Sequence, residues 1–275
     1  MAKYLNIFNL GLIITEDCNL RCGHCMRGHY SNSSMSDEVI NATLDQITSI
    51  GTLSICGGEP LLALDQMEKI FKRIKRNNIL VDEVNVTING TIYSDRFLSL
   101  VSSMDGYLHV INNTKKQLFH ISISNDQYHD QELERLHLKK LYLENIKKYA
   151  QTKYFDGLQI LSMKPFNEGN AAFLDKSLTV PLRPMQTFIT YTNDGKHYDK
   201  NGVCQIGSLI TVNVNGIVTE CDASVINQEK KYNYGNILEE SIEDIFLKNG
   251  TLVLKPRKFE RLVEKERKRF LTYKR

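Results

Sequence analysis

The chain has 275 residues, of which 41% are hydrophobic and 24% are charged. This length can bury a sizeable core, as one large domain or as one domain with a small appendage, and the composition is that of an ordinary globular protein. The N-terminus lacks the residue order of a signal peptide, and no apolar run approaches membrane-spanning length. We therefore expect a cytoplasmic protein with no membrane partner, in which cysteines stay reduced and serve metal binding or catalysis.

The net charge of +3 is unevenly distributed, because residues 255–275 hold ten Lys and Arg against three Glu. The tail therefore carries +7 and the rest of the chain −4. A basic tail can contact nucleic acid, an acidic peptide or a membrane surface. We favour a solvated helix face and do not expect nucleic acid as a partner. Phe259, Leu262, Val263 and Phe270 would give this helix a thin apolar side for docking.

Near the N-terminus, an apolar run over residues 10–14 predicts a buried strand, and Cys18, Cys22 and Cys25 follow it. Three thiolates in one loop can hold three irons of a cubane cluster, whereas a four-iron cluster normally has four cysteines. One iron would then be open to a substrate. A zinc knuckle and unpaired core thiols are the alternatives, but no second Cys-x-x-Cys pair lies nearby to complete a zinc site.

Strand and helix patterns then alternate about five times up to about residue 165, which is typical of parallel βα units. The predicted strands are 10–14, 53–56, 84–88, 118–123 and 158–161, and the predicted helices are 36–51, 67–74, 97–101 and 130–149. Ser36 is the expected N-cap of the first helix, and Gly51 is its expected stop.

The second predicted strand runs directly into Gly57-Gly58-Glu59-Pro60. Two glycines allow a backbone to approach a ligand closely, and Glu59 can accept hydrogen bonds from an ammonium group. A bare glycine turn is the alternative. Cys56, just before the glycines, is expected to pack as a small buried residue, with a redox or hydrogen-donor role as the alternative.

Polar residues also end later strands. Alternation places Ser122, Ser124 and Asp126 on one face, where they could hold a ribose or a carboxylate. The alternative is a polar turn with Asp126 as a helix cap.

The pattern changes after about residue 181. Residues 187–192 and 209–214 are strand-like, and Asn215-Gly216 predicts a hairpin turn. A helix is expected over 241–247. We therefore expect three parts: residues 1–184, an appended domain of hairpins and one helix over 185–250, and a basic helical tail over 251–275.

The cysteine loop resembles the signature of the radical S-adenosylmethionine (SAM) enzymes in its common form Cys-Asn-Leu-Arg-Cys-x-His-Cys, with Met26 where the family often has Tyr. Residues 57–60 are similar to the Gly-Gly-Glu-Pro motif of the same family. The resemblance implies an α/β fold, a partial (β/α)6 TIM-like barrel. It also implies a [4Fe-4S] cluster on Cys18, Cys22 and Cys25, and SAM bound through its amino group by Gly57, Gly58 and Glu59.

By the same resemblance, Ser122, Ser124 and Asp126 contact the nucleoside, Asn89 lies toward the cofactor, and Asn170 lies near its carboxylate. The spacing of Cys204, Gly216 and Cys221 looks like the opening of SPASM and twitch domains. These two cysteines could bind a second iron–sulfur cluster or another metal, or the appendage could be clusterless. In a third interpretation, Cys221 is a thiol that returns a hydrogen atom to a substrate radical.

The function that the resemblance implies is that of a radical SAM oxidoreductase. Such an enzyme cleaves SAM to a 5′-deoxyadenosyl radical and abstracts a hydrogen atom, and we favour a ribosomally made peptide or a protein as the substrate. The alternatives are a small-molecule dehydrogenase or epimerase and, in another class, a non-catalytic iron–sulfur or zinc protein. An electron donor such as flavodoxin or ferredoxin is the expected partner.

Overall fold

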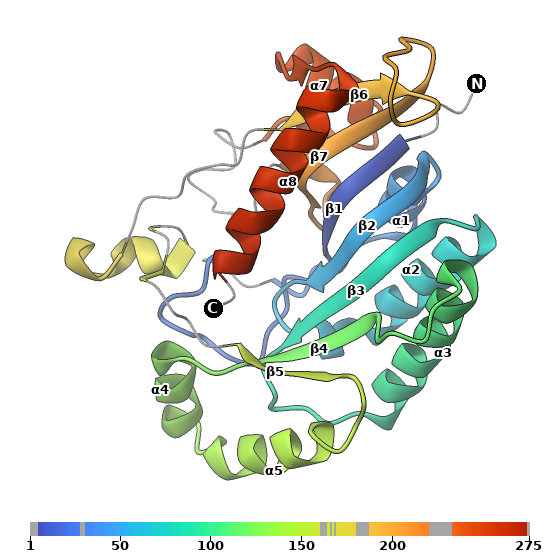
Figure 1. Cartoon of the computed structure of the whole chain (residues 1–275). Coiled ribbons are helices and arrows are strands. Elements are labelled where there is room, and N and C mark those ends of the chain that lie inside the picture. Colours follow the sequence, from blue (N-terminus) through green and yellow to red (C-terminus); the bar gives the residue numbers. More distant parts are fainter. Residues whose placement is uncertain are drawn as a thin grey trace.

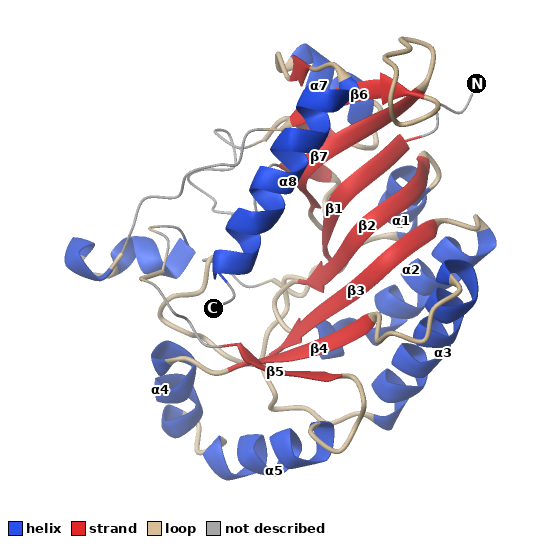
Figure 2. Ribbon diagram, viewed as in Figure 1, coloured by secondary structure: helices blue, strands red, loops and turns tan. Residues whose placement is uncertain are grey.

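The computed structural model describes residues 5–27, 31–159, 164–165, 167, 169–179, 187–219 and 233–273. Strands and helices alternate through the first half (Figures 1 and 2). In order these are β1 (Leu5–Ile13), α1 (Asp37–Leu44), β2 (Ile47–Cys56), η1 (Pro60–Ala63), α2 (Leu64–Arg76), β3 (Leu80–Ile88), α3 (Asp95–Asn112), β4 (Phe119–Ser124), α4 (Gln127–Arg135), α5 (Lys139–Tyr149) and β5 (Phe155–Gln159).

The second half holds short helical turns and further strands. These elements are η2 (Gly169–Phe173), η3 (Lys176–Leu178), β6 (Phe188–Thr192), β7 (Val203–Val212), β8 (Ile217–Thr219), β9 (Gly235–Asn236), α7 (Ile242–Lys248), β10 (Leu252–Val253) and α8 (Pro256–Tyr273). No helix in the described ranges is long and apolar enough to cross a membrane.

One sheet contains all of these strands, in the order β10-β6-β7-β1-β2-β3-β4-β5, with β8 and β9 attached beyond β7. Strands β1 to β5 are parallel neighbours in chain order, as right-handed βα crossovers produce. Among the described residues the sheet ends at β10 on one side and at β5 on the other and does not close. The fold is therefore the α/β partial barrel that was predicted, with five of its βα strands in the described part of the chain.

The two faces of the sheet differ in polarity. Helices α1, α2 and α3 cover one face, where the alternate residues of each strand are buried and apolar (Figure 2). The opposite face, called here the inner face, carries half-buried polar residues: Asn9, Thr52, Ser54, Glu83, Asn85, Thr87, His120, Ser122 and Ser124. The register sets Ser54, Asn85 and His120 side by side. The interior of a closed TIM barrel is packed with branched apolar residues, so this polar face is suited to a ligand.

Two predicted helices were wrong in their limits. Helix α1 ends at Leu44, and Gly51 lies inside strand β2 instead of stopping a helix. A Cβ at Gly51 would lie 2.6 Å from the Phe8 carbonyl oxygen, so glycine is needed there for the approach of β1. The helix predicted over 130–149 is two helices, α4 and α5, because His137 between them adopts a left-handed φ of 56°.

The predicted hairpin region continues the sheet of the first half. Strand β7 pairs parallel with β1 on one side and antiparallel with β6 on the other. The turn at Asn215-Gly216 joins β7 to β8 as predicted, with Gly216 at a φ of 81°. The predicted helix is also present as α7, with Ser241 as its N-cap.

Candidate active site

The cysteine loop follows β1 and lies against the turn that follows β2. The Gly58 amide donates to the Thr15 carbonyl at 2.8 Å, and the Glu59 amide donates to the Asp17 carbonyl at 2.8 Å. A Cβ added to Gly58 would lie 2.0 Å from the Asp17 oxygen and 3.0 Å from the Cys18 Cβ. The contact therefore requires glycine. The two motifs, 40 residues apart in sequence, form one unit.

The three cysteines of this loop are free and partly exposed. Burial, with added repulsion from Glu59 and Cys25, raises the pKa of Cys18 to about 11. Burial also raises the pKa of Cys22, and both Cys25 and Cys18 contribute to that rise. The thiols of this loop therefore resist ionisation more strongly the more their charges are brought together.

No group of three or more His, Cys, Asp or Glu side chains in the described ranges is placed to hold a single metal ion. In a cubane cluster each cysteine binds a different iron, so its ligands stand farther apart than those of one ion. Three adjacent thiols in one loop fit that requirement. The amides of Leu20 (3.5 Å) and Asn89 (Nδ2, 4.0 Å) also donate to Cys18 Sγ, as second-shell donors do at metal-bound sulfur.

Glu59 is fully buried, with 1% of its surface exposed. Its Oε1 accepts from the Leu61 amide at 3.0 Å, and its Oε2 accepts from the Asn89 amide at 2.7 Å. Burial raises its pKa to about 7, and the two amides moderate the rise. Both oxygens are thus engaged by the backbone, and the side chain ties the end of β2 to the end of β3.

Asn89 joins the end of β3 to the cysteine loop. Its Nδ2 donates to Asn19 Oδ1 at 2.8 Å, and Asn19 Nδ2 donates in turn to Thr91 Oγ1 at 2.8 Å. Thr91 completes the network by donating through Oγ1 to Asn89 Oδ1 at 2.7 Å. Asn89 was a predicted site residue. Asn19 and Thr91 were missed, because only the fold brings residues 72 positions apart together.

Asp126 caps helix α4 and also contacts the cysteine loop. Its Oδ1 accepts from the amides of Tyr128 and His129, and its Oδ2 lies 3.3 Å from Nε2 of His24. Burial would raise the pKa of Asp126, but His24 and the two amides bring it below the usual value. The His24 ring stacks on Tyr128 at 5.0 Å. Asp126 therefore acts as the helix cap that was the alternative prediction, and it also contacts His24 of the cysteine loop.

A second carboxylate of α4 also supports the loop. Glu132 Oε1 accepts from the Arg21 amide at 2.8 Å, and Arg135 binds both Glu132 oxygens. Nothing in the sequence singled out Glu132, because the helix that contains it carries no motif. Ser122 and Ser124 lie on the inner face of β4, next to the strand end from which Asp126 follows.

Asn170 brings a distant segment back to the cysteines. Its backbone amide donates to the Cys25 carbonyl at 2.8 Å, and its Nδ2 donates to the Cys22 carbonyl at 3.1 Å. A Cβ at Gly169 would lie 2.2 Å from the Cys25 oxygen. The turn after β5 therefore packs directly on the cysteine loop, and the role of Asn170 near the cofactor carboxylate stays a prediction.

Of the remaining cysteines, Cys56 lies near the cysteine loop and Cys204 lies far from it. Cys56 ends β2 beside the glycines, where Arg27 Nη2 donates to its Sγ at 3.5 Å and its thiol donates to the Leu12 carbonyl at 3.6 Å. Cys204 is 2% exposed and pairs with Leu5, at the start of β1 and thus the opposite end of the sheet from the cysteine loop. Cys221 lies outside the described residues.

The family model described as "Radical SAM superfamily" matches residues 12–170, more than half of the chain. This segment contains both motifs of the site. The chain belongs to the radical SAM superfamily. It is an enzyme by that membership, and the superfamily implies a [4Fe-4S] cluster and SAM as cofactors.

The curated relatives include several named GTP 3′,8-cyclase. The chain is 29% identical over 97 residues to the one from Desulforamulus reducens, a match that covers 33% of this chain and 29% of that protein. It is 38% identical to a probable GTP 3′,8-cyclase of Methanocaldococcus jannaschii over 31% of this chain and 30% of that protein. Each match thus spans about a third of the relative's length.

A solved structure shares the fold over most of the chain. The structure titled "Native anSMEcpe with bound AdoMet and Cp18Cys peptide" has a TM-score of 0.50 and 19% identity, and it covers 87% of this chain and 80% of that chain. Streptococcus suis SuiB bound to precursor peptide SuiA gives a TM-score of 0.40 and 11% identity, over 90% of this chain and 65% of that chain.

Proposed function

We propose that the protein is a radical SAM oxidoreductase that modifies a peptide or a protein side chain. The observation that carries this proposal is the direct packing of the Gly57-Gly58-Glu59 turn on the cysteine loop through two backbone hydrogen bonds. A bare metal scaffold has no use for a second, glycine-rich turn held beside its cysteines. A site that binds a cluster and a small molecule side by side requires such a turn.

Bound here, the cluster and SAM would supply an electron and a 5′-deoxyadenosyl radical that abstracts a hydrogen atom from the substrate. Cys18, Cys22 and Cys25 would hold the cluster as thiolates, so their protons leave when it binds. Gly57 and Gly58 would let the backbone approach the amino group of SAM. Glu59 positions this turn from beneath through its contacts to Leu61 and Asn89.

Other residues of the site would hold the nucleoside and the loop. Ser122 and Ser124 point from the inner face toward the space in front of the sheet, where hydroxyl groups can bind a ribose. Asp126 would contribute by holding His24, and Asn170 by holding the Cys22 carbonyl. These four residues are the proposed SAM-binding shell, together with Asn89.

The substrate class rests on two features. The described strands leave the sheet open between β10 and β5, which favours a bulky chain as the molecule that approaches the inner face. The solved anSMEcpe structure contains a peptide, and the chain shares its fold. The second candidate is a small polar molecule, favoured by the GTP 3′,8-cyclase relatives and by the polar inner face. Flavodoxin or ferredoxin is the proposed electron donor.

Residues 185–250 are proposed as a SPASM/twitch-like segment in which Cys204 and Cys221 bind a second cluster or Cys221 donates a hydrogen atom. Iron and sulfide counting on the Cys204→Ala/Cys221→Ala variant tests the metal alternatives. Iron and sulfide contents equal to those of the wild type would rule out a second cluster on these two cysteines. Cys56 beside the glycines is a further candidate for a redox role, supported by its contact with Arg27.

Anaerobic reconstitution tests the function. Protein loaded with iron and sulfide, reduced with dithionite and given SAM should release 5′-deoxyadenosine, and the Cys22→Ala variant should release none. Val110→Ala is the control, because it shortens a side chain that is 80% exposed on α3 and has no role in the proposed site. Wild-type protein that binds iron without releasing 5′-deoxyadenosine would contradict the proposal.

A further inference from the structure

Helix α8 has one face fixed to the sheet and one face exposed. Phe259 packs on Phe188 of β6, with ring centroids 5.4 Å apart, and Leu262 and Val263 join the same cluster. The predicted apolar side of the tail is confirmed for these three residues. Arg257, Lys258, Arg261 and Lys265 are exposed on the other side. The helix is therefore held in place with its cations facing outward.

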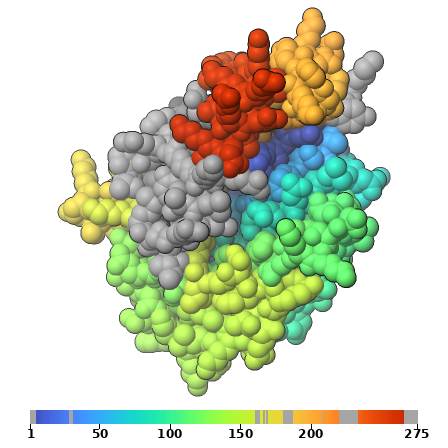
Figure 3. All heavy atoms as spheres, viewed as in Figure 1, coloured from blue at the N-terminus to red at the C-terminus, as the bar shows by residue number. Residues whose placement is uncertain are grey.

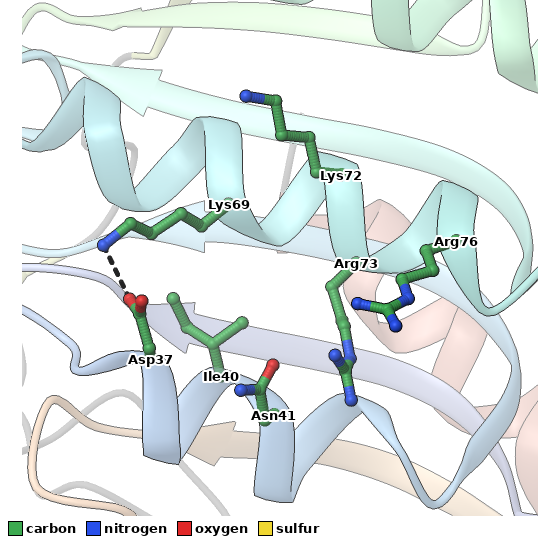
Figure 4. Close-up of a pocket in the computed structure, with 7 residues that line it drawn as sticks. All are labelled: Asp37, Ile40, Asn41, Lys69, Lys72, Arg73 and Arg76. Atoms are coloured by element: carbon green, nitrogen blue, oxygen red, sulfur yellow. Dashed lines mark hydrogen bonds and ion pairs between the residues drawn. The ribbon is translucent and has the colours of Figure 1, made fainter.

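The exposed cations of α8 contrast with three cations of α2 in their ion pairing. None of the four forms an ion pair with another described residue. On α2, by contrast, Lys69 pairs with Asp37 at 2.6 Å, Lys72 with Glu68, and Arg73 with Asp45. Figure 4 draws one of these pairs, Lys69 with Asp37, at the pocket between α1 and α2. The excess positive charge of the chain is thus concentrated on α8.

This helix lies on the inner face of the sheet. A Cβ at Gly207 would lie 2.5 Å from the Phe188 ring and 3.0 Å from Val263, so α8 covers the side of β7 to which Gly207 belongs. In the register of β7, β1 and β2, Leu209 pairs with Asn9 and Asn9 pairs with Thr52. The side of β7 that α8 covers is therefore the inner face. Figure 1 shows α8 crossing β7 on the face opposite α1 to α3.

The direction of α8 places it beside the substrate opening. It runs the same way as β7 and β1, toward the edge where the cysteine loop begins (Figure 1). The described atoms of this C-terminal region form part of the outer surface in Figure 3. The cations from Arg257 to Lys265 lie on the first half of this helix, beside β6, so a ligand that reaches the inner face from the β10 edge would pass them.

We propose that the exposed cationic face of α8 is the docking surface for an acidic segment of the peptide that the enzyme modifies. This proposal rests on the proposed function, which makes a peptide the substrate. The acidic character of the docking segment follows from charge complementarity with the exposed cations of α8. Uncompensated surface cations attract an oppositely charged partner and speed its encounter, and salt screens the effect.

A peptide fits this surface better than a nucleic acid. Proteins that bind single strands interleave aromatic side chains with their cations so that bases can stack. The exposed face of the first half of α8 has no aromatic residue, since Phe259 is turned to the sheet.

The test measures binding of a fluorescein-labelled ten-residue polyglutamate peptide to the full chain by anisotropy. Arg261→Glu/Lys265→Glu should weaken binding by about tenfold at low salt, and the difference should shrink as salt rises. Lys115→Glu/Lys116→Glu is the matched control, because it makes the same charge change at exposed residues before β4 and should bind as wild type does. Arg261→Lys/Lys265→Arg should also retain binding.

Three results would overturn the proposal. The first is equal binding by the α8 variant and the wild type, or no binding by the wild type. The second is tighter binding of a twelve-nucleotide oligouridylate that the α8 variant loses. The third is loss of flavodoxin-driven turnover with unchanged peptide binding, which would assign the face to the electron donor. Substrate-free 5′-deoxyadenosine release with dithionite reports on the proposed function alone, and the α8 variant should retain it.

Discussion

Gly58→Ala tests the contact between the two motifs. The new Cβ would lie 2.0 Å from the Asp17 oxygen and 2.5 Å from its carbonyl carbon, both backbone atoms that cannot rotate away. The turn must therefore move off the cysteine loop and lose the hydrogen bonds from Gly58 to Thr15 and from Glu59 to Asp17. Two hydrogen bonds at about 1 kcal/mol each, with about 1 kcal/mol of overpacking, cost about 3 kcal/mol.

A loss of this size shifts the equilibrium between docked and undocked loop by about a hundredfold. We expect the variant to unfold at lower denaturant concentration and to retain less iron after reconstitution. Gly106→Ala is the control, because nothing lies within 4 Å of its Cβ and alanine favours a helix. Gly58→Ala with wild-type stability and iron content would refute the argument that the glycine is required by this contact.

Three further predictions concern stability. The Glu59 pKa of about 7 is above its unfolded value of 4.5, so the folded state binds the extra proton and stability should fall as pH rises from about 4.5 to about 7. Urea unfolding at several pH values should show this slope in the wild type and a flatter one in Glu59→Gln. Asp126→Asn removes the ion pair with His24 and weakens the α4 cap, which should cost about 1 kcal/mol near neutral pH. Because the pKa of Asp126 is lowered, its charged form stabilises the fold above the unfolded pKa of 3.8, and the difference between variant and wild type should vanish in acid. Phe259→Ala should cost about 3 kcal/mol and release α8 to limited proteolysis, whereas an α8 as resistant as in the wild type would show that other contacts hold it.

The local patterns predicted the strands better than the first helix. Ile40, Leu44 and Ile47 recur at helical spacing, yet Ile47 belongs to β2. The spacing was ambiguous because the last helical residue and the first strand residues both face the core. Pairing with β1 decided the boundary, and a single sequence does not show pairing.

Part of the site could be predicted because its motifs are continuous in sequence. The cysteine spacing and the glycine pair can each be recognised within a short stretch of sequence. Because β1 and β2 are parallel, the motifs that follow them lie at the same edge of the sheet. The supports of the loop could not be predicted. His24 to Asp126 and Arg21 to Glu132 are contacts across about a hundred residues, made by a helix whose sequence carries no motif.

The sequence by itself determined the chemistry, because ligand type and spacing are properties of a short stretch of chain: three thiols in one loop and a glycine pair after a strand. The tertiary structure decided what surrounds that chemistry. It joined β7 to β1 in one open sheet, turned the polar residues to one face, and fixed α8 on that face with its cations outward. These features depend on which strand pairs with which, and pairing is settled by burial summed over the whole sheet.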